Sequence, residues 1–175
     1  MDFSAVDLGV QPSPSAYDQL IIQGMGAMHV LFDAITTKKG RDGRYEDRGI
    51  AAVECVACTM TKYGYPNDEG RPEHSLWSQG LSECQSSIVE VCDSPWLKEV
   101  FDQMTQSARR IWRDKCEAYY KTSDGPRKAP QARHFIFLFR EHTFECIARD
   151  LVVTLYSESW PAAAAKVLAA RSWRN

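Results

Sequence analysis

The sequence lacks the features that mark several classes of protein. None of its apolar runs approaches the roughly 20 residues that a membrane-spanning helix needs, and residues 1–14 lack the basic start and apolar stretch of a secretory signal. Lys and Arg (21) do not outnumber Asp and Glu (23), and the net charge of −2 argues against the basic face of a nucleic-acid-binding protein. We therefore expect a cytoplasmic protein that binds neither membrane nor nucleic acid.

Motifs of catalysis and metal binding are also missing. The chain has no H-E-x-x-H, no G-x-S-x-G and no P-loop. Its six cysteines are expected to be free thiols, since disulfides belong mainly to secreted proteins. If the run around Cys55 and Cys58 is a strand, the two thiols point to opposite faces and cannot bind one ion; if it is a helix, no second pair has matching spacing. We expect small core cysteines, no metal and no cofactor.

What remains is an ordinary globular composition. The chain has 175 residues, of which 44% are hydrophobic and 25% charged, which suits one domain with a sizeable core. Residues 1–14 contain two prolines and predict an irregular N-terminal arm, leaving residues 15–175 as the domain. From Tyr17 to Ile35 apolar residues recur at three- and four-residue spacing, which predicts a helix capped by Ser15 and ended by Gly40.

The middle of the chain predicts strands and one long helix. Residues 50–61 are rich in Val, Cys, Thr and Ala and favour a strand, with a helix as the open alternative. Residues 86–92 form a β-branched run typical of a strand. Ser94 and Pro95 suit the N-cap and first turn of a helix whose apolar stripe runs to Tyr119.

A phenylalanine-rich hairpin is predicted over residues 134–148, with Glu141 and His142 as its two-residue connection. One face must be core, and its members are Phe135, Phe137, Phe139, Phe144, Cys146 and Ala148. The second face is apolar enough to be covered by a helix or used by a partner, and it carries Ile136, Leu138, Arg140, Thr143, Glu145 and Ile147.

The remaining C-terminal pattern completes the predicted fold. The hairpin's second strand is expected to continue to Tyr156, and a last helix to run from Ser159 to about Arg174. Together these elements predict an α+β fold: an antiparallel sheet of about four strands, packed with a long central helix and with N- and C-terminal helices.

Between the regular segments lies a turn that gathers polar side chains. Pro66 and Asn67 favour a turn, so Asp68, Glu69 and His74 are presented on loop backbone, where binding and catalytic residues are common. In the alternative interpretation, Asn67 and Asp68 only cap the turn through bonds to the backbone.

Three sequence blocks carry a resemblance to a known family. They are Gly64-Tyr-Pro-Asn-Asp-Glu69 with His74 and Gly80-Leu81, then Glu90-Val-x-x-Ser94-x-Trp96-Leu, then Phe135-x-Phe-x-Phe with Thr143-Phe-Glu-Cys-Ile-Ala148. The chain resembles a family of small uncharacterised bacterial proteins with a Pro-Asn-Asp-Glu turn, a His-Pro-Leu and a Phe-His-Asp-Ser-Thr-Phe-Glu hairpin. It departs from that pattern at Ser75, where the family has Pro, and at residues 140–142, where it has His-Asp-Ser. The resemblance implies a shared architecture over residues 50–150 and no particular activity.

Two functional hypotheses use the same residues. The favoured hypothesis is a non-enzymatic binding or interaction protein of the adaptor, immunity or inhibitor type, which binds a protein partner or small ligand through the turn and the second hairpin face. A homo-oligomer that buries the hairpin face is a further hypothesis. The candidate binding residues are Tyr65, Asn67, Asp68, Glu69, His74, Trp77, Glu90, Arg140, His142 and Glu145.

The alternative is a small acid-base or metal-assisted enzyme. In it His74, beside Asp68 or Glu69, acts together with Glu90 and Glu145. An enzyme of this kind predicts a pocket lined by these groups with perturbed pKa values. A binding protein predicts an apolar patch near Phe137 or Leu138 instead.

Overall fold

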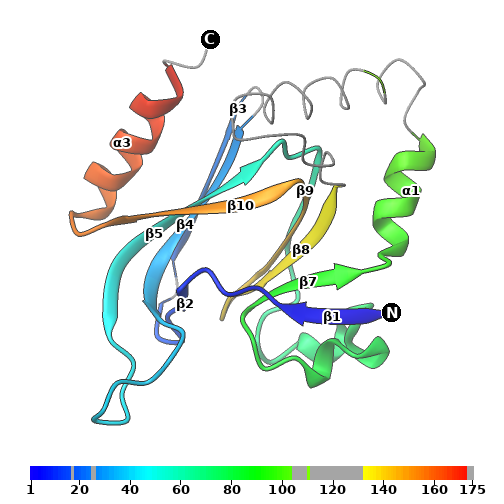
Figure 1. Ribbon diagram of the computed structural model, residues 1–175, viewed down its shortest axis with the longest axis horizontal. Helices are drawn as coiled ribbons and strands as arrows, with labels where there is room; N and C mark the ends of the chain where they lie inside the picture. The colour runs from blue at the N-terminus through cyan, green and yellow to red at the C-terminus, as the bar shows by residue number, and fades with distance from the viewer. Residues whose placement is uncertain (17, 25–26, 104–109, 111–131, 173–175) are drawn as a thin grey trace, which may run out of the picture.

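Two antiparallel five-stranded sheets make up most of the structure (Figure 1). The computed structural model describes residues 1–16, 18–24, 27–103, 110 and 132–172. The first sheet has the order β1 (Asp2–Ala5), β7 (Ile88–Cys92), β8 (Arg133–Leu138), β9 (Thr143–Ala148), β6 (Met60–Gly64). The second sheet has the order β10 (Asp150–Tyr156), β5 (Asp47–Val56), β4 (Ala27–Thr36), β2 (Val10–Pro12), and β3 (Gln19–Gly24) also pairs with β4.

The predicted α+β fold with a four-stranded sheet is therefore wrong, and the largest error is the N-terminal helix. Its residues form the β3–β4 hairpin, paired from Gln19 with Phe32 to Gly24 with Ala27. Strand β4 is covered on both faces: Val30 and Phe32 point into the core between the sheets, whereas Leu31 lies in a second apolar cluster. A strand buried on both faces shows no clean alternation, so its apolar residues also fit a helical spacing. The predicted irregular arm contributes two strands, β1 and β2.

One antiparallel ribbon runs through both sheets. Strands β5 and β10 pair in the second sheet, and their neighbours β6 and β9 pair in the first. Between them the chain bends at Ala57, whose φ of 50° is left-handed. The backbone pairing continues across the bend, because Thr59 N–H donates to Ile147 O at 2.8 Å and Arg149 N–H donates to Val56 O at 2.8 Å. The strand expected at 50–61 is confirmed but interrupted, and the expected continuation to Tyr156 belongs to the other sheet.

The phenylalanine hairpin has the predicted faces with a different turn. Leu138 pairs with Thr143, and Phe139 N–H donates to His142 O, so the connection is Arg140 and Glu141 rather than Glu141 and His142. The partners shift by an even number of residues, which leaves each side chain on its face. All six residues assigned to the core face lie in the cluster between the sheets.

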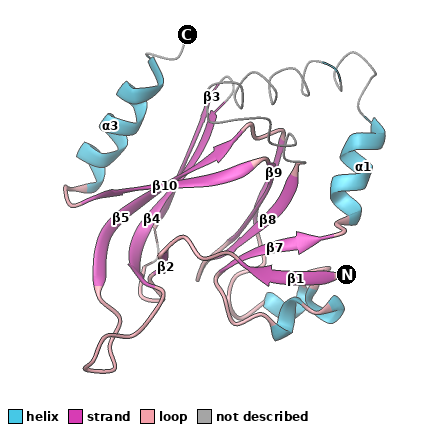
Figure 2. Cartoon of the chain, viewed as in Figure 1, coloured by secondary structure: helices cyan, strands magenta, loops and turns pink. Residues whose placement is uncertain are grey.

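The outer face of each sheet has its own cover (Figure 2). On the first sheet, α1 (Pro95–Gln103) packs through Val100 on Ile147. The 3₁₀ segment, residues 71–83, contains three short 3₁₀ helices: η1 (Arg71–Glu73), η2 (Trp77–Gln79) and η3 (Leu81–Glu83). This segment contributes Leu76 and Leu81 to an apolar cluster on the same sheet. On the second sheet, α3 (Trp160–Ser172) supplies Ala163 and Val167. The second hairpin face is therefore buried within the chain.

Two of the three predicted helix starts are close to those observed. The N-cap at Ser94 is confirmed, since Leu97 N–H donates to its Oγ at 3.1 Å, and the last helix begins at Trp160. The predicted extension of the central helix to Tyr119 lies outside the described residues, apart from Arg110. The predicted end of the last helix, beyond residue 172, also lies outside them. None of the helices within the described part of the chain is long and apolar enough to cross a membrane.

We predict that the bend at Ala57 tolerates glycine, unlike the strand before it. In the left-handed region an alanine costs roughly 1 kcal/mol, about as much as the extra freedom of glycine in the unfolded chain. Ala57→Gly should thus change the free energy of unfolding by less than about 0.5 kcal/mol in urea denaturation. The control Ala52→Gly, in buried β5, should cost about 1–2 kcal/mol, because it loses a buried methyl group without relieving strain. Equal losses in the two variants would show that the bend carries no strain.

Candidate functional site

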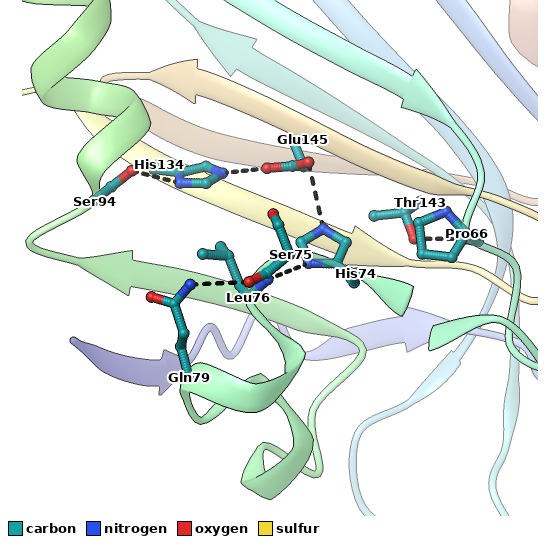
Figure 3. A network of polar contacts seen from close by, with 9 residues as sticks. All are labelled: Pro66, His74, Ser75, Leu76, Gln79, Ser94, His134, Thr143 and Glu145. Atoms are coloured by element: carbon teal, nitrogen blue, oxygen red, sulfur yellow. Dashed lines mark hydrogen bonds and ion pairs between the residues drawn. The ribbon is translucent and has the colours of Figure 1, made fainter. Parts of the chain in front are cut away.

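A polar network lies on the outer face of the first sheet, between the two apolar covers (Figure 3). Its centre is Glu145 of β9, and its other members are His134 of β8, His74 after η1 and Ser94 before α1. Strand alternation puts His134 on the face of Ile136, and pairing of Ile136 with Glu145 makes His134 and Glu145 diagonal neighbours. The network thus joins three segments that are far apart in sequence.

Hydrogen bonds connect the four side chains of the network. Glu145 Oε2 lies 2.9 Å from His134 Nε2, and Oε1 lies 3.4 Å from His74 Nε2. His74 Nδ1 accepts from Leu76 N–H at 3.2 Å, so the proton of the neutral ring is on Nε2 and points to Glu145. His134 Nδ1 lies 2.8 Å from Ser94 Oγ, which also accepts from Leu97 N–H at 3.1 Å. Each of these polar atoms therefore has its partner inside the network.

Glu145 is held as a carboxylate. Burial alone raises the pKa of Glu145, but the hydrogen bonds from His134 and His74 and the charge of Lys62 outweigh it and lower the pKa to about 2. Lys62 pairs with Glu145 across β6 and β9, and its Nζ lies 3.9 Å from the centre of the Trp96 ring. A general acid or base needs a pKa near neutrality, and Glu145 is shifted in the opposite direction.

The network is largely buried. His134 is 1% exposed, Ser94 4% and His74 8%, and the side chain of Glu145 is 12% exposed. The cluster has the perturbed carboxylate that the enzyme hypothesis predicts, but the pKa of Glu145 is shifted away from neutrality and the nitrogens of both imidazoles already have partners inside the network. The arrangement connects the 3₁₀ segment and α1 to the sheet through the carboxylate of Glu145. This connection is stabilising because a buried charge is costly to leave unpaired.

The capping interpretation of the turn is confirmed for the side chain of Asn67, whereas Asp68 contributes its backbone. Asn67 Oδ1 accepts from Gly70 N–H at 2.9 Å, and the backbone N–H of Asp68 donates to Arg140 O at 2.7 Å. Thr143 Oγ1 donates to Pro66 O at 2.7 Å, which fixes the turn on the hairpin. The side chains of Asp68 and Glu69 are exposed and lie outside the polar network.

Of the ten predicted site residues, the structure brings only His74 and Glu145 into the network. Glu90 forms an ion pair with Arg133, whose Nε lies 2.8 Å from Glu90 Oε1. Trp77 packs on the apolar cluster beneath the 3₁₀ segment. Arg140 Nε lies 3.6 Å from Glu141 Oε1. The site that the enzyme hypothesis shared between Glu90 and Glu145 is thus not formed, because the two carboxylates have different partners.

The two remaining predicted residues lie near β6. The His142 ring stacks on Tyr63 at 5.0 Å between centroids, and Tyr65 is exposed. The sequence analysis missed His134 and Lys62, and treated Ser94 as a helix cap alone. The signal for His134 was its alternation with Ile136 and Leu138 on the face that carries Glu145.

A metal site requires several ligating side chains close together. Within the described ranges, no group of three or more His, Cys, Asp or Glu side chains is arranged to hold a metal ion. Comparison of the chain with family models, with curated proteins and with solved structures found no match. The resemblance to the bacterial family therefore remains a prediction, and function rests on the site and the surface.

We predict that Glu145 stabilises the fold in a pH-dependent way. Its folded pKa of about 2 lies below the ordinary 4.5, so its contribution is complete above about pH 4.5 and is lost as the pH falls toward about 2. In urea unfolding near neutral pH, Glu145→Gln should lower the free energy of unfolding by up to about 3 kcal/mol. The difference in free energy of unfolding between Glu145→Gln and the wild type should shrink as the pH falls.

A matched control is the exposed Glu69→Gln, for which no comparable gap is expected. If the gap for Glu145→Gln stayed the same from neutral pH down to about pH 2.5, the carboxylate would not be the source of the stabilisation.

Proposed function

We propose that the protein is a non-enzymatic interaction protein, of the adaptor, immunity or inhibitor type, that binds an extended segment of a protein partner along the edge of β6. One observation carries this proposal: large aromatic side chains stand exposed on and beside an edge strand. Tyr63 is 48% exposed and Tyr65 65% exposed, and Met60 at the start of β6 is exposed as well.

The edge of β6 offers backbone hydrogen-bonding groups. β6 is the last strand of the first sheet and pairs with β9 on one side, while no described strand pairs with its outer side. An unpaired edge presents N–H and C=O groups to another extended chain, and peptide recognition by strand addition uses such an edge. Backbone pairing would supply affinity, and the aromatic side chains would supply selectivity.

The aromatic side chains are held in place before any partner arrives. Tyr63 stacks on the His142 ring at 5.0 Å. Tyr65 lies over Gly70, where an added methyl group would collide with its ring, and its hydroxyl hydrogen-bonds to Glu73, which raises the pKa of Tyr65. Aromatic anchors that are already ordered lose little conformational entropy on binding, and tyrosine is enriched among the residues that dominate interface energies.

The buried polar network around Glu145 supports the same proposal. It contributes rigidity rather than chemistry, since it joins the 3₁₀ segment and α1 to the sheet that carries β6. The hairpin face expected to bind a partner is unsuitable, because Ile136 and Leu138 are buried under the 3₁₀ segment. The recognition surface is therefore moved to the edge strand and the turn that follows it.

We predict that the wild-type chain selects extended peptides from an array of segments about eight residues long. For the strongest peptide, Tyr65→Ala should weaken binding by at least about tenfold in titration calorimetry, because it removes an exposed aromatic anchor. The matched control is Leu168→Ala, an exposed apolar residue on α3, which should bind as wild type does.

Equal losses in the two variants, or no selected peptide, would contradict binding at β6. A homo-oligomer could use the same edge by pairing β6 with β6 of a second copy. Sedimentation of the wild type and of Tyr65→Ala distinguishes this case, because the dimer would weaken with the mutation.

A further inference from the structure

Three thiols meet at the bend of the ribbon. Cys55 is the last residue but one of β5, Cys146 lies on β9, and Cys58 follows the bend at Ala57. Cys146 Sγ lies 3.7 Å from Cys55 Sγ, and Cys58 and Cys146 also share a hydrogen bond. The prediction that Cys55 and Cys58 point to opposite faces is wrong, because the left-handed residue between them interrupts the strand alternation.

The three thiols differ in how far solvent reaches them. Cys55 and Cys146 are fully buried in the core between the sheets, whereas Cys58 is only partly buried. Cys58 also lines a cavity of about 210 Å³ with Gln23, Met28, Met60 and Thr61. A water molecule occupies about 30 Å³ in the liquid, so the cavity has room for a small oxidant beside Cys58.

The contacts also shift the pKa values of Cys58 and Cys146 in opposite directions. The hydrogen bond with Cys146 lowers the pKa of Cys58, against the opposing effect of burial, and Cys58 Sγ lies 3.6 Å from Met60 O. Burial raises the pKa of Cys146. The thiolate is the nucleophilic form of cysteine, so Cys58 is the thiol suited to attack an oxidant, and Cys146 is the thiol that is hydrogen-bonded to it.

We propose that Cys58 and Cys146 form a peroxide-responsive dithiol site, with Cys58 as the attacking thiol and Cys146 as its disulfide partner. The Cys58 thiolate attacks one oxygen of a hydroperoxide, the O–O bond breaks, and the products are Cys58 sulfenic acid and hydroxide, or alkoxide from an organic peroxide. The Cys146 thiol then attacks the Cys58 sulfur, which forms the S–S bond and releases water. This modification site is independent of the binding proposed for β6.

The test treats the full chain with hydrogen peroxide and maps the cysteines by mass spectrometry after alkylation. The expected product has lost two hydrogens and joins the tryptic peptides 49–62 and 141–149, with fragmentation placing the link on Cys58. Dithiothreitol should reverse it. Cys58 should react at least about tenfold faster than Cys84 and Cys92, the other partly exposed thiols of the described residues.

Variants separate the two roles. Cys58→Ser should abolish the link, and the control Cys84→Ser should leave it intact. Cys146→Ala should trap Cys58 as a sulfenic acid that dimedone labels, with circular dichroism confirming that the variant is folded. If Cys146→Ala does not fold, the peptide map of the wild type decides. No link, a link made by Cys55, or equal oxidation of Cys58 and Cys84 would overturn the proposal.

Discussion

The fold depends on a backbone ladder that stays paired while it changes sheets. Strands β5 and β6 form one side of this ribbon and strands β10 and β9 the other, and the bonds from Thr59 and Arg149 continue it across the bend. Buried backbone groups must be paired, and a strand that switches sheets normally does so at a bulge or bend. Because the ribbon belongs to both sheets, their inner faces close over one core, in which Val53 of β5 and Phe135 of β8 lie together.

The outer face of the same ribbon carries the second constraint. Glu145 lies on β9, and its largely buried charge is bound by His74 and His134 together. The 3₁₀ segment and α1 cover this face of the first sheet through two apolar clusters. Directional bonds from His74 and from Ser94 through His134 set where these two covers lie.

Short-range signals in the sequence predicted the elements whose character is local. Ser94 and Pro95 mark the start of α1, and the β-branched run marks β7. The hairpin faces followed from alternation alone. The N-terminal hairpin could not be found in this way, because β4 is buried on both sides and its pattern fits two periods. The contact between His74 and Glu145 joins segments 71 residues apart. Hydrophobic periodicity in a single sequence does not indicate contacts over such a separation.

The bend also determines what the surface can do. By ending β5 at Val56 and restarting the strand at Met60, it makes β6 an edge strand, while β5 is an inner strand of its sheet. The interruption that exposes this edge also turns Cys58 toward Cys146. Met60 and Thr61 belong both to the exposed edge and to the wall of the thiol cavity. An extended peptide lying along the whole of β6 would therefore pass the cavity that contains Cys58, so the proposed binding edge and the proposed thiol site follow from one feature of the backbone.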